Sequence, residues 1–397
     1  MNRDTFRIKY IFGFTSSFYL RLLYMDLEII KTPALLLDVE KMSRNAERMS
    51  ERVKTLGVEL RPHVKTHKSA EIARIQTAGH AGGIMVSTLA EARAFLAAGF
   101  TDITYGVPVE PGKFAEVFEL AHACGQFAVL TDDLETVRSL EAEAGKAGAK
   151  ISAFIEIDTG DHRSGVAPGS KAAIEISREI ADAKHLRFAG ILTHAGHSYE
   201  APSADERLAI ARAERDLMRE LAEKLAEDGI EVPTVSIGST PTITCVDHLE
   251  GVTEVRPGNY IFFDAFQAAL GSCAFEDCAL TVLAAVVHRS FEKRHIIVDA
   301  GAIALSKDRG AVNFDAACGY GTVLDINGNA LGLHVDGLSQ EHGKILVNDK
   351  TLLEKLKVGT RLRILGNHSC LTAAQFDYYN VLENDRITGR WQRFNGW

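Results

Sequence analysis

Paired cysteines are lacking in this chain of 397 residues. The six cysteines stand at positions 124, 245, 273, 278, 318 and 370, without the spacing of a disulfide framework or of a Cys-x-x-Cys zinc module. A small secreted domain held together by disulfides is therefore disfavoured. We expect a reducing, cytoplasmic compartment.

Clustered positive charge is lacking as well. The chain has 44 Lys and Arg against 53 Asp and Glu, which gives a net charge of -9. Proteins that bind the nucleic-acid backbone neutralise phosphates with clustered Lys and Arg. The sequence therefore predicts no nucleic-acid partner.

No apolar run is long enough to cross a bilayer. Residues 10–20 follow three basic residues, as in a signal peptide, but Gly13 and the polar residues 15–17 interrupt the run, and no small-residue cleavage site follows. We expect no membrane partner and interpret residues 1–24 as an N-terminal extension, with Met25 as an alternative start. A weak amphipathic anchor is the less favoured interpretation.

Short apolar runs alternate with segments of helical period from about residue 43 to 265, which is typical of βα units around a parallel sheet. Helical period is clearest at 90–98, 134–147 and 204–228. The expected strands are 58–64, 83–86, 102–105, 127–130, 151–157, 187–192, 232–237 and 252–255. Eight strands in this length predict an α/β fold with a (β/α)8 TIM-like barrel.

The pattern changes after about residue 275, where helical period nearly disappears. Strands are expected at 279–287, 295–298, 321–325, 344–347, 361–365 and 379–382, so a second, mostly antiparallel β domain follows the barrel. The apolar stretch 34–37 is a candidate extra strand of that domain. We therefore divide the chain into the extension 1–24, a strand segment 25–42, the barrel 43–270 and the C-terminal β domain 271–397.

Lys65 lies in the segment Arg-Pro-His-Val-Lys-Thr-His-Lys at 61–68, directly after the first expected strand. Active sites of such barrels lie at the C-terminal ends of the strands. An amine at this place can form a Schiff base with an aldehyde cofactor and later move protons. From composition alone, a solvated basic turn is the favoured interpretation.

Loops after the later strands offer groups that could hold an anionic ligand. Gly238 permits close approach of the backbone, and Ser239 and Thr240 add hydroxyl and amide donors after the seventh strand, where barrels commonly bind phosphate. Tyr260 could add a hydroxyl from the eighth loop. Arg163, after the fifth strand, fits either an anion contact or a surface turn.

His368 and Cys370 are separated by one residue in Gly-Asn-His-Ser-Cys at 366–370. On an extended chain, residues i and i+2 face the same side, so the imidazole and the thiolate would converge. Zinc accepts such N/S pairs, and two protein ligands leave positions for water and substrate. A buried pair within a strand is the alternative.

The chain resembles the pyridoxal-phosphate (PLP) family of D-threonine aldolases and D-serine dehydratases, within the alanine-racemase-like fold. The resemblance extends from residue 31 to about 380 and rests above all on Pro-His-x-Lys-Thr-His around Lys65 and on His-x-Cys at 368–370. It implies that Lys65 carries the cofactor and that Arg163 contacts the cofactor's phenolate oxygen. Tyr199 is favoured over His194 and His197 as a further cofactor contact, and a homodimer is expected.

The same resemblance implies a metal-assisted lyase. In the dehydratase branch His-x-Cys binds a divalent metal, preferably zinc, whereas the aldolase branch tends to have Asp in place of the cysteine. Cys370 therefore favours elimination of water from a β-hydroxy D-amino acid such as D-serine, D-threonine or 3-hydroxy-D-aspartate. Retro-aldol cleavage to glycine and an aldehyde is the alternative. A racemase or a cofactor-holding protein without turnover is less favoured, since neither needs the metal pair.

Overall fold

The computed structural model describes residues 26–397, so the expected extension 1–24 and the alternative start at Met25 lie outside the described residues. Eight parallel strands form one sheet in the order β2-β9-β8-β7-β6-β5-β4-β3. The strands are β2 Glu59–Leu60, β3 Ile84–Val86, β4 Asp102–Pro108, β5 Gln126–Thr131, β6 Ile151–Ile157, β7 Leu186–Thr193, β8 Val235–Ile237 and β9 Glu254–Val255. Each of the eight expected strands is thus confirmed.

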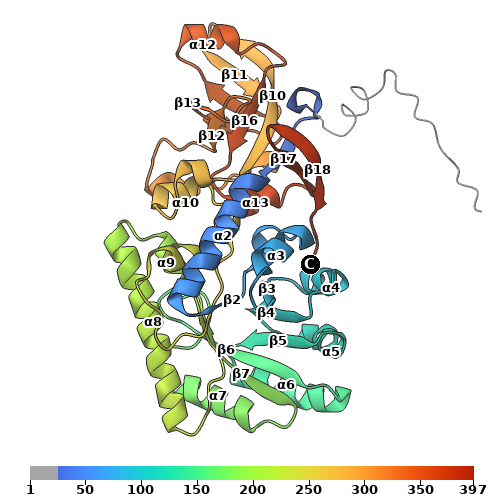
Figure 1. Ribbon diagram of the computed structural model, residues 1–397, viewed down its shortest axis with the longest axis vertical. Helices are drawn as coiled ribbons and strands as arrows, with labels where there is room; N and C mark the ends of the chain where they lie inside the picture. The colour runs from blue at the N-terminus through green and yellow to red at the C-terminus, as the bar shows by residue number, and fades with distance from the viewer. Residues whose placement is uncertain (1–25) are drawn as a thin grey trace, which may run out of the picture.

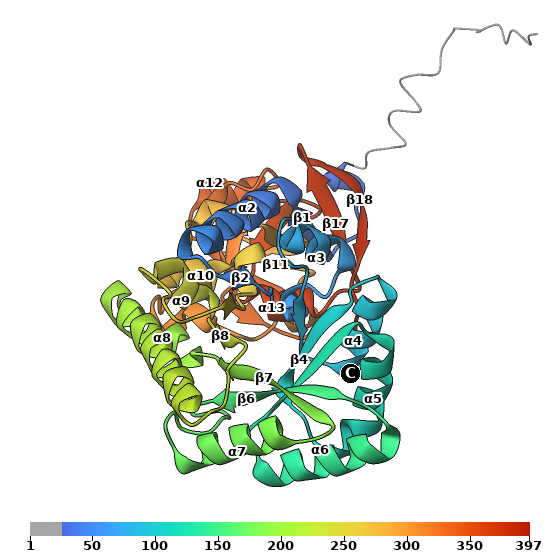
Figure 2. The same cartoon turned by 60° about the horizontal axis from the view of Figure 1, so that its bottom comes forward.

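The two ends of this sheet meet. His63, just after β2, forms a parallel bridge with Met85 of β3, and the Met85 amide donates to the Pro62 carbonyl at 3.0 Å. Helices surround the curled sheet (Figure 2). They include α2 Val39–Leu56, α3 Ala70–Thr77, α4 Leu89–Ala97, α5 Phe114–Ala123, α6 Leu134–Ala147, α7 Lys171–Asp182, α8 Ala204–Glu227 and α9 Thr240–Cys245, and the short helix α10 Ala265–Leu270 follows next to the β domain. The predicted barrel is confirmed.

The long helix α8 shows how local sequence builds these elements. The Ser203 side chain caps its first turn by accepting from the Glu206 amide at 3.2 Å, and acidic residues in that turn favour the positive end of the helix dipole. Buried side chains then recur every three or four residues, at Ala211, Glu214, Met218, Leu221 and Leu225. Three charged residues of the helix are buried with them, Arg207, Glu214 and Arg215.

The second sheet has ten strands and is mixed but mostly antiparallel. Its strands are β1 Ala34–Asp38, β10 Leu280–Ser290, β11 His295–Val298, β12 Thr322–Leu324, β13 Ala330–His334, β14 Gly337–Leu338, β15 Gly343–Leu346, β16 Arg361–Leu365, β17 Tyr378–Glu383 and β18 Arg386–Gln392. The early strand β1 pairs antiparallel with β10 and parallel with β17. The mostly antiparallel β domain is thus confirmed.

The barrel and the β domain form the two halves of the molecule, with α2 crossing between them (Figure 1). Contacts from the C-terminal end of the chain reach the loop that carries Lys65: the Tyr379 hydroxyl donates to the His67 carbonyl at 2.7 Å, and the Phe394 amide donates to the Lys68 carbonyl at 2.6 Å. Among residues 26–397, no helix combines the length and apolarity needed to span a bilayer.

Candidate active site

A cavity of about 360 Å³ opens between the C-terminal ends of the barrel strands and the β domain. Of the nine residues proposed from the sequence, the cavity lining includes Lys65, Arg163, Tyr199, Ser239, Thr240, His368 and Cys370. These residues come from both halves of one chain. The structure therefore brings the expected amine and the expected metal pair to a single site.

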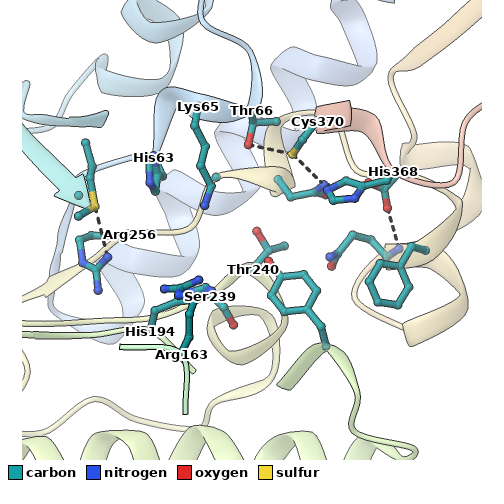
Figure 3. A pocket seen from close by; sticks show the side chains of 18 of the residues that line it. His63, Lys65, Thr66, Arg163, His194, Ser239, Thr240, Arg256, His368 and Cys370 are labelled. Carbon is teal, nitrogen blue, oxygen red and sulfur yellow. Dashed lines mark hydrogen bonds between the residues drawn. The ribbon is translucent and has the colours of Figure 1, made fainter. Parts of the chain in front are cut away.

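Lys65 belongs to a short 3-10 turn, Val64–Thr66, that follows β2. Its side chain extends to the centre of the site, with Arg256 and Cys370 on opposite sides of it (Figure 3). Burial of the amine in the cavity lowers the pKa of Lys65, and the Cys370 thiolate only partly offsets this effect. A larger fraction of the amine is therefore uncharged and nucleophilic near neutral pH.

Contacts of His67 and Thr66 fix the loop around Lys65. The ring of His67 is fully buried, accepts the Ser69 amide at 3.0 Å and contacts the Gln76 side-chain oxygen at 2.8 Å. The Cys370 thiol lies 3.5 Å from the Thr66 hydroxyl. The residue after the lysine thus touches the proposed metal ligand.

His368 and Cys370 converge, but not on a strand as the sequence analysis expected. His368 is extended, and Ser369–Ala373 form the short helix α13, which places Cys370 in the first helical turn. The helix starts here because the Ser369 amide donates to Asp264 at 2.9 Å and the Thr372 amide donates to the His368 carbonyl at 3.0 Å. The strand prediction at this place is wrong.

Asp308 completes this pair and was assigned no chemistry from the sequence. Its carboxylate lies 2.6 Å from Nδ1 of His368, which leaves Nε2 as the free ring nitrogen. Burial lowers the pKa of His368, but Asp308 and Cys370 outweigh it and raise the pKa to about 11. Burial opposes ionisation of Cys370, yet its contact with His368 lowers the thiol pKa. The sequence offered no signal for Asp308, because the contact joins residues far apart in the chain.

The loop after β8 forms the hydroxyl-rich side of the cavity. Ser239 caps α9, and its hydroxyl lies 3.0 Å from the Ser198 hydroxyl in the loop after β7. Thr240 follows at the start of the helix, and its hydroxyl accepts the Tyr260 amide at 3.2 Å. These two hydroxyls face the cavity together with the Tyr199 ring.

Gly238 and Tyr260 do not line the cavity. The amide of Gly238 donates to the carboxylate of Glu214 at 3.0 Å, so it is not free for an anion. Gly238 has a φ of +105°, and a Cβ there would lie 2.8 Å from Ile243, so glycine is needed for the close approach of α9. The ring of Tyr260 is fully buried away from the cavity. Neither residue therefore stands among the lining residues, and both contact the loop after β8 from its buried side.

Positive charge lies on the barrel side of the cavity. Arg163 is 3.8 Å from both Glu156 and Asp161 and lines the cavity as expected. Arg256, directly after β9, is buried and was missed; its Nε donates to Ser236 at 2.8 Å, and burial lowers its pKa to about 10. Its position at the end of the eighth strand was a signal that could have identified it.

Two histidines also line the cavity, His63 and His194. Burial lowers the pKa of both well below the usual value, and the charge of Lys65 adds to the effect. His194 had been ranked below Tyr199, and both residues lie at the site; His197 is not among the lining residues. The two cavity histidines are therefore neutral near pH 7.

A buried lysine at the mouth of a (β/α)8 barrel, with a β domain closing the site, is an arrangement that suits a barrel-type pyridoxal-phosphate enzyme. Comparison with known families supports this class of enzyme. The alanine racemase N-terminal domain matches residues 37–265, and the putative serine dehydratase domain matches residues 279–382. The chain therefore belongs to the family of D-threo-3-hydroxyaspartate dehydratases, D-serine dehydratases and D-threonine aldolases.

Relatives match over nearly the whole chain. A D-threo-3-hydroxyaspartate dehydratase from Delftia sp. (strain HT23) is 41% identical over 374 residues, which cover 93% of this chain and 98% of the relative. A D-serine dehydratase from Dictyostelium discoideum is 35% identical over 381 residues, covering 91% and 95%. This chain is thus homologous to PLP-dependent dehydratases, which are ammonia-lyases.

Solved structures of members of this family also superpose on this chain. A cysteine-to-alanine variant of D-threo-3-hydroxyaspartate dehydratase, in the metal-free form, superposes with a TM-score of 0.91 at 40% identity and covers 94% of this chain and 100% of its own. A histidine-to-alanine variant changes a residue two positions away from that cysteine. D-threonine aldolase from Filomicrobium marinum superposes with a TM-score of 0.82 at 30% identity, covering 94% and 97%.

Proposed function

We propose that this enzyme eliminates water from a β-hydroxy D-amino acid of the D-serine, D-threonine or 3-hydroxy-D-aspartate type, giving a 2-oxo acid and ammonia. One observation carries the proposal. Lys65, His368 and Cys370 line one cavity of about 360 Å³ within a single chain, so one small substrate can meet both the amine and the metal pair.

The residues present fit PLP. Lys65 is the attachment point, with its pKa lowered by burial. Ser239 and Thr240 would hold the phosphate, while Tyr199 and Arg163 would contact the rest of the cofactor. His63 also lines this cavity, and its buried Nδ1 has no hydrogen-bond partner among the described residues. When bound, PLP delocalises the negative charge that forms as the α-proton leaves.

The residues present also fit a divalent metal. His368 offers Nε2 because Asp308 occupies Nδ1, and Cys370 supplies a thiol whose lowered pKa favours the thiolate. Among residues 26–397, no group of three or more His, Cys, Asp and Glu side chains is placed to hold a metal ion. His368 and Cys370 are N and S ligands that zinc accepts, and a two-ligand site would leave positions open for water and substrate. When bound, the metal acts as a Lewis acid that makes the β-hydroxyl a better leaving group.

Lys65 performs the proton chemistry in this proposal. With substrate bound, its Nζ would take the proton from Cα of the substrate. The charge of Arg163 opposes protonation of this amine, whereas the Cys370 thiolate favours it. The amine can therefore accept the proton during the reaction and return to the neutral form afterwards.

Retro-aldol cleavage to glycine and an aldehyde remains the alternative. It would use the same lysine and the same metal pair but break the Cα–Cβ bond of the substrate. The structural likeness to a D-threonine aldolase favours it. The thiol ligand at Cys370 favours elimination instead.

Product analysis separates the two reactions. The purified enzyme, loaded with PLP and zinc, is incubated with D-serine, D-threonine and D-threo-3-hydroxyaspartate. We expect ammonia with pyruvate, 2-oxobutyrate or oxaloacetate, and we expect a chelator to abolish the products until zinc is restored. Glycine with an aldehyde would support the aldolase, and full activity in the presence of chelator would contradict the metal assignment.

We also propose that the enzyme is a cytoplasmic homodimer, as the family resemblance and the scattered cysteines imply. Sedimentation velocity at micromolar concentration tests the assembly: a species of twice the chain mass is expected, and a monomer that retains full activity would contradict it. Fractionation of the cells that produce the protein tests the compartment.

A further inference from the structure

Glu214 is a charged residue in the buried stripe of α8. Its side chain is 1% exposed and does not line the cavity. Glutamate is almost never fully buried unless its carboxylate is paired or hydrogen-bonded. The position therefore calls for a specific set of partners.

The carboxylate joins two loops. One oxygen, Oε1, accepts the Ala195 amide at 3.1 Å and the Gly238 amide at 3.0 Å. Ala195 lies just after β7, and Gly238 lies just after β8. A single buried atom thus fixes the spacing between neighbouring loops of the barrel mouth.

These loops carry the proposed cofactor contacts. Tyr199 follows Ala195 in the first loop, and Ser239 and Thr240 follow Gly238 in the second. The loops touch again nearer the cavity, where the Ser198 and Ser239 hydroxyls lie 3.0 Å apart. Glu214 therefore forms the deeper of two links beneath the hydroxyl-rich side of the cavity.

The other carboxylate oxygen, Oε2, has no hydrogen-bond partner among the described residues. Burial raises the pKa of Glu214 to about 7, while the two amides, the charge of Arg256 and the Thr242 hydroxyl oppose the rise. A proton on Oε2 would leave Oε1 free to accept both amides. The link between the loops therefore survives in either protonation state.

We propose that Glu214 is a positioning residue that holds the loops after β7 and β8 in register and so preforms the cradle for the cofactor phosphate. The inference rests on the proposed function, because it assumes that PLP occupies this cavity. It predicts that the acceptor at Oε1, rather than the negative charge, is what cofactor binding requires.

Three variants test the inference. Glu214→Gln keeps an acceptor oxygen for both amides, Glu214→Ala removes it, and Glu220→Ala removes an exposed glutamate of the same helix as a control. The dissociation constant of PLP is measured by titrating each apoenzyme and following the cofactor absorbance. Thermal unfolding and amide exchange of the segments 194–199 and 236–243 are measured on the same apoproteins.

We expect Glu214→Ala to raise the dissociation constant for PLP about tenfold or more and to speed amide exchange in both segments, because two buried donors lose their acceptor. Glu214→Gln and Glu220→Ala should stay within about threefold of the parent protein. If Glu214→Ala does not fold, Glu214→Gln still tests the proposal. A tenfold loss of affinity for PLP in Glu214→Gln would overturn it.

A merely structural role gives a different result. Lower thermal stability of Glu214→Ala with an unchanged PLP dissociation constant would overturn the proposal. Failure of the parent protein to bind PLP would instead refute the proposed function. The two failures are therefore distinguishable.

Discussion

Asp308 holds the imidazole of His368 through a 2.6 Å contact, although sixty positions separate the two residues. Lys65, His368 and Cys370 could be proposed from the sequence because each stands in a short motif whose neighbours identify it. Asp308 depends on a contact that only the fold creates, and Arg256 stands outside any such motif although it follows an expected strand. Residues inside motifs were therefore predictable, and their supporting partners were not.

Substitution of Asp308 tests this support. We expect Asp308→Ala to weaken metal binding about 10- to 100-fold, because the ring of His368 loses the group that orients it and raises its basicity. Asp315→Asn, an exposed carboxylate nearby in the chain, serves as the control. Zinc titration of the chelator-treated proteins provides the measurement, and equal affinities in the two variants would contradict the role.

At the scale of elements, long periodic segments were predicted well, and short or polar ones were not. The expected helix at 134–147 coincides with α6, whereas β18 was missed because only one of its seven residues is buried. The sequence shows no alternation in such an edge strand. The helix α13 was mistaken for a strand because five residues carry too little periodicity to distinguish the two.

The strand β17 supports the catalytic loop through Tyr379, whose buried hydroxyl donates to the His67 carbonyl. We expect Tyr379→Phe to lower the free energy of unfolding by about 1–2 kcal/mol, because the buried carbonyl loses a hydrogen-bond donor. Tyr378→Phe, at the neighbouring and less buried tyrosine, should change it little. Chemical denaturation of both variants makes the comparison, and equal losses would contradict the contact.

For the whole molecule, the rule that barrel active sites lie at the C-terminal strand ends predicted which loops meet. It could not predict how the β domain closes over them. That closure brings Cys370 to within 3.5 Å of Thr66, across 304 positions of sequence. The sequence alone therefore could not predict how close the Lys65 amine lies to His368 and Cys370.

The same closure buries His63, His67 and His194 as neutral rings. Burial lowers the pKa of each, to about 3 for His67, below the unfolded value near 6.5. Below pH 6.5 the unfolded chain binds protons that the folded protein does not, so stability falls as the pH falls. Between pH 7 and 5.5 we expect a loss of about 1.3 kcal/mol for each of the three.

Urea unfolding of the apoprotein at both pH values measures this loss. His67→Asn should reduce the loss of unfolding free energy between pH 7 and 5.5 by about 1.3 kcal/mol. His342→Asn, at an exposed histidine, should leave that loss unchanged. An equal pH dependence in the parent protein and in His67→Asn would show that the ring of His67 is not held neutral.

The central claim is that Lys65 removes the α-proton while the His368 and Cys370 site serves departure of the β-hydroxyl. Exchange of the α-hydrogen of D-serine in D₂O, followed by NMR alongside pyruvate release, separates these two steps in PLP-loaded variants. We predict that His368→Ala still exchanges the α-hydrogen but releases little pyruvate, and that Lys65→Ala does neither. Pyruvate release by His368→Ala at the parent rate, or exchange by Lys65→Ala at the parent rate, would contradict the account.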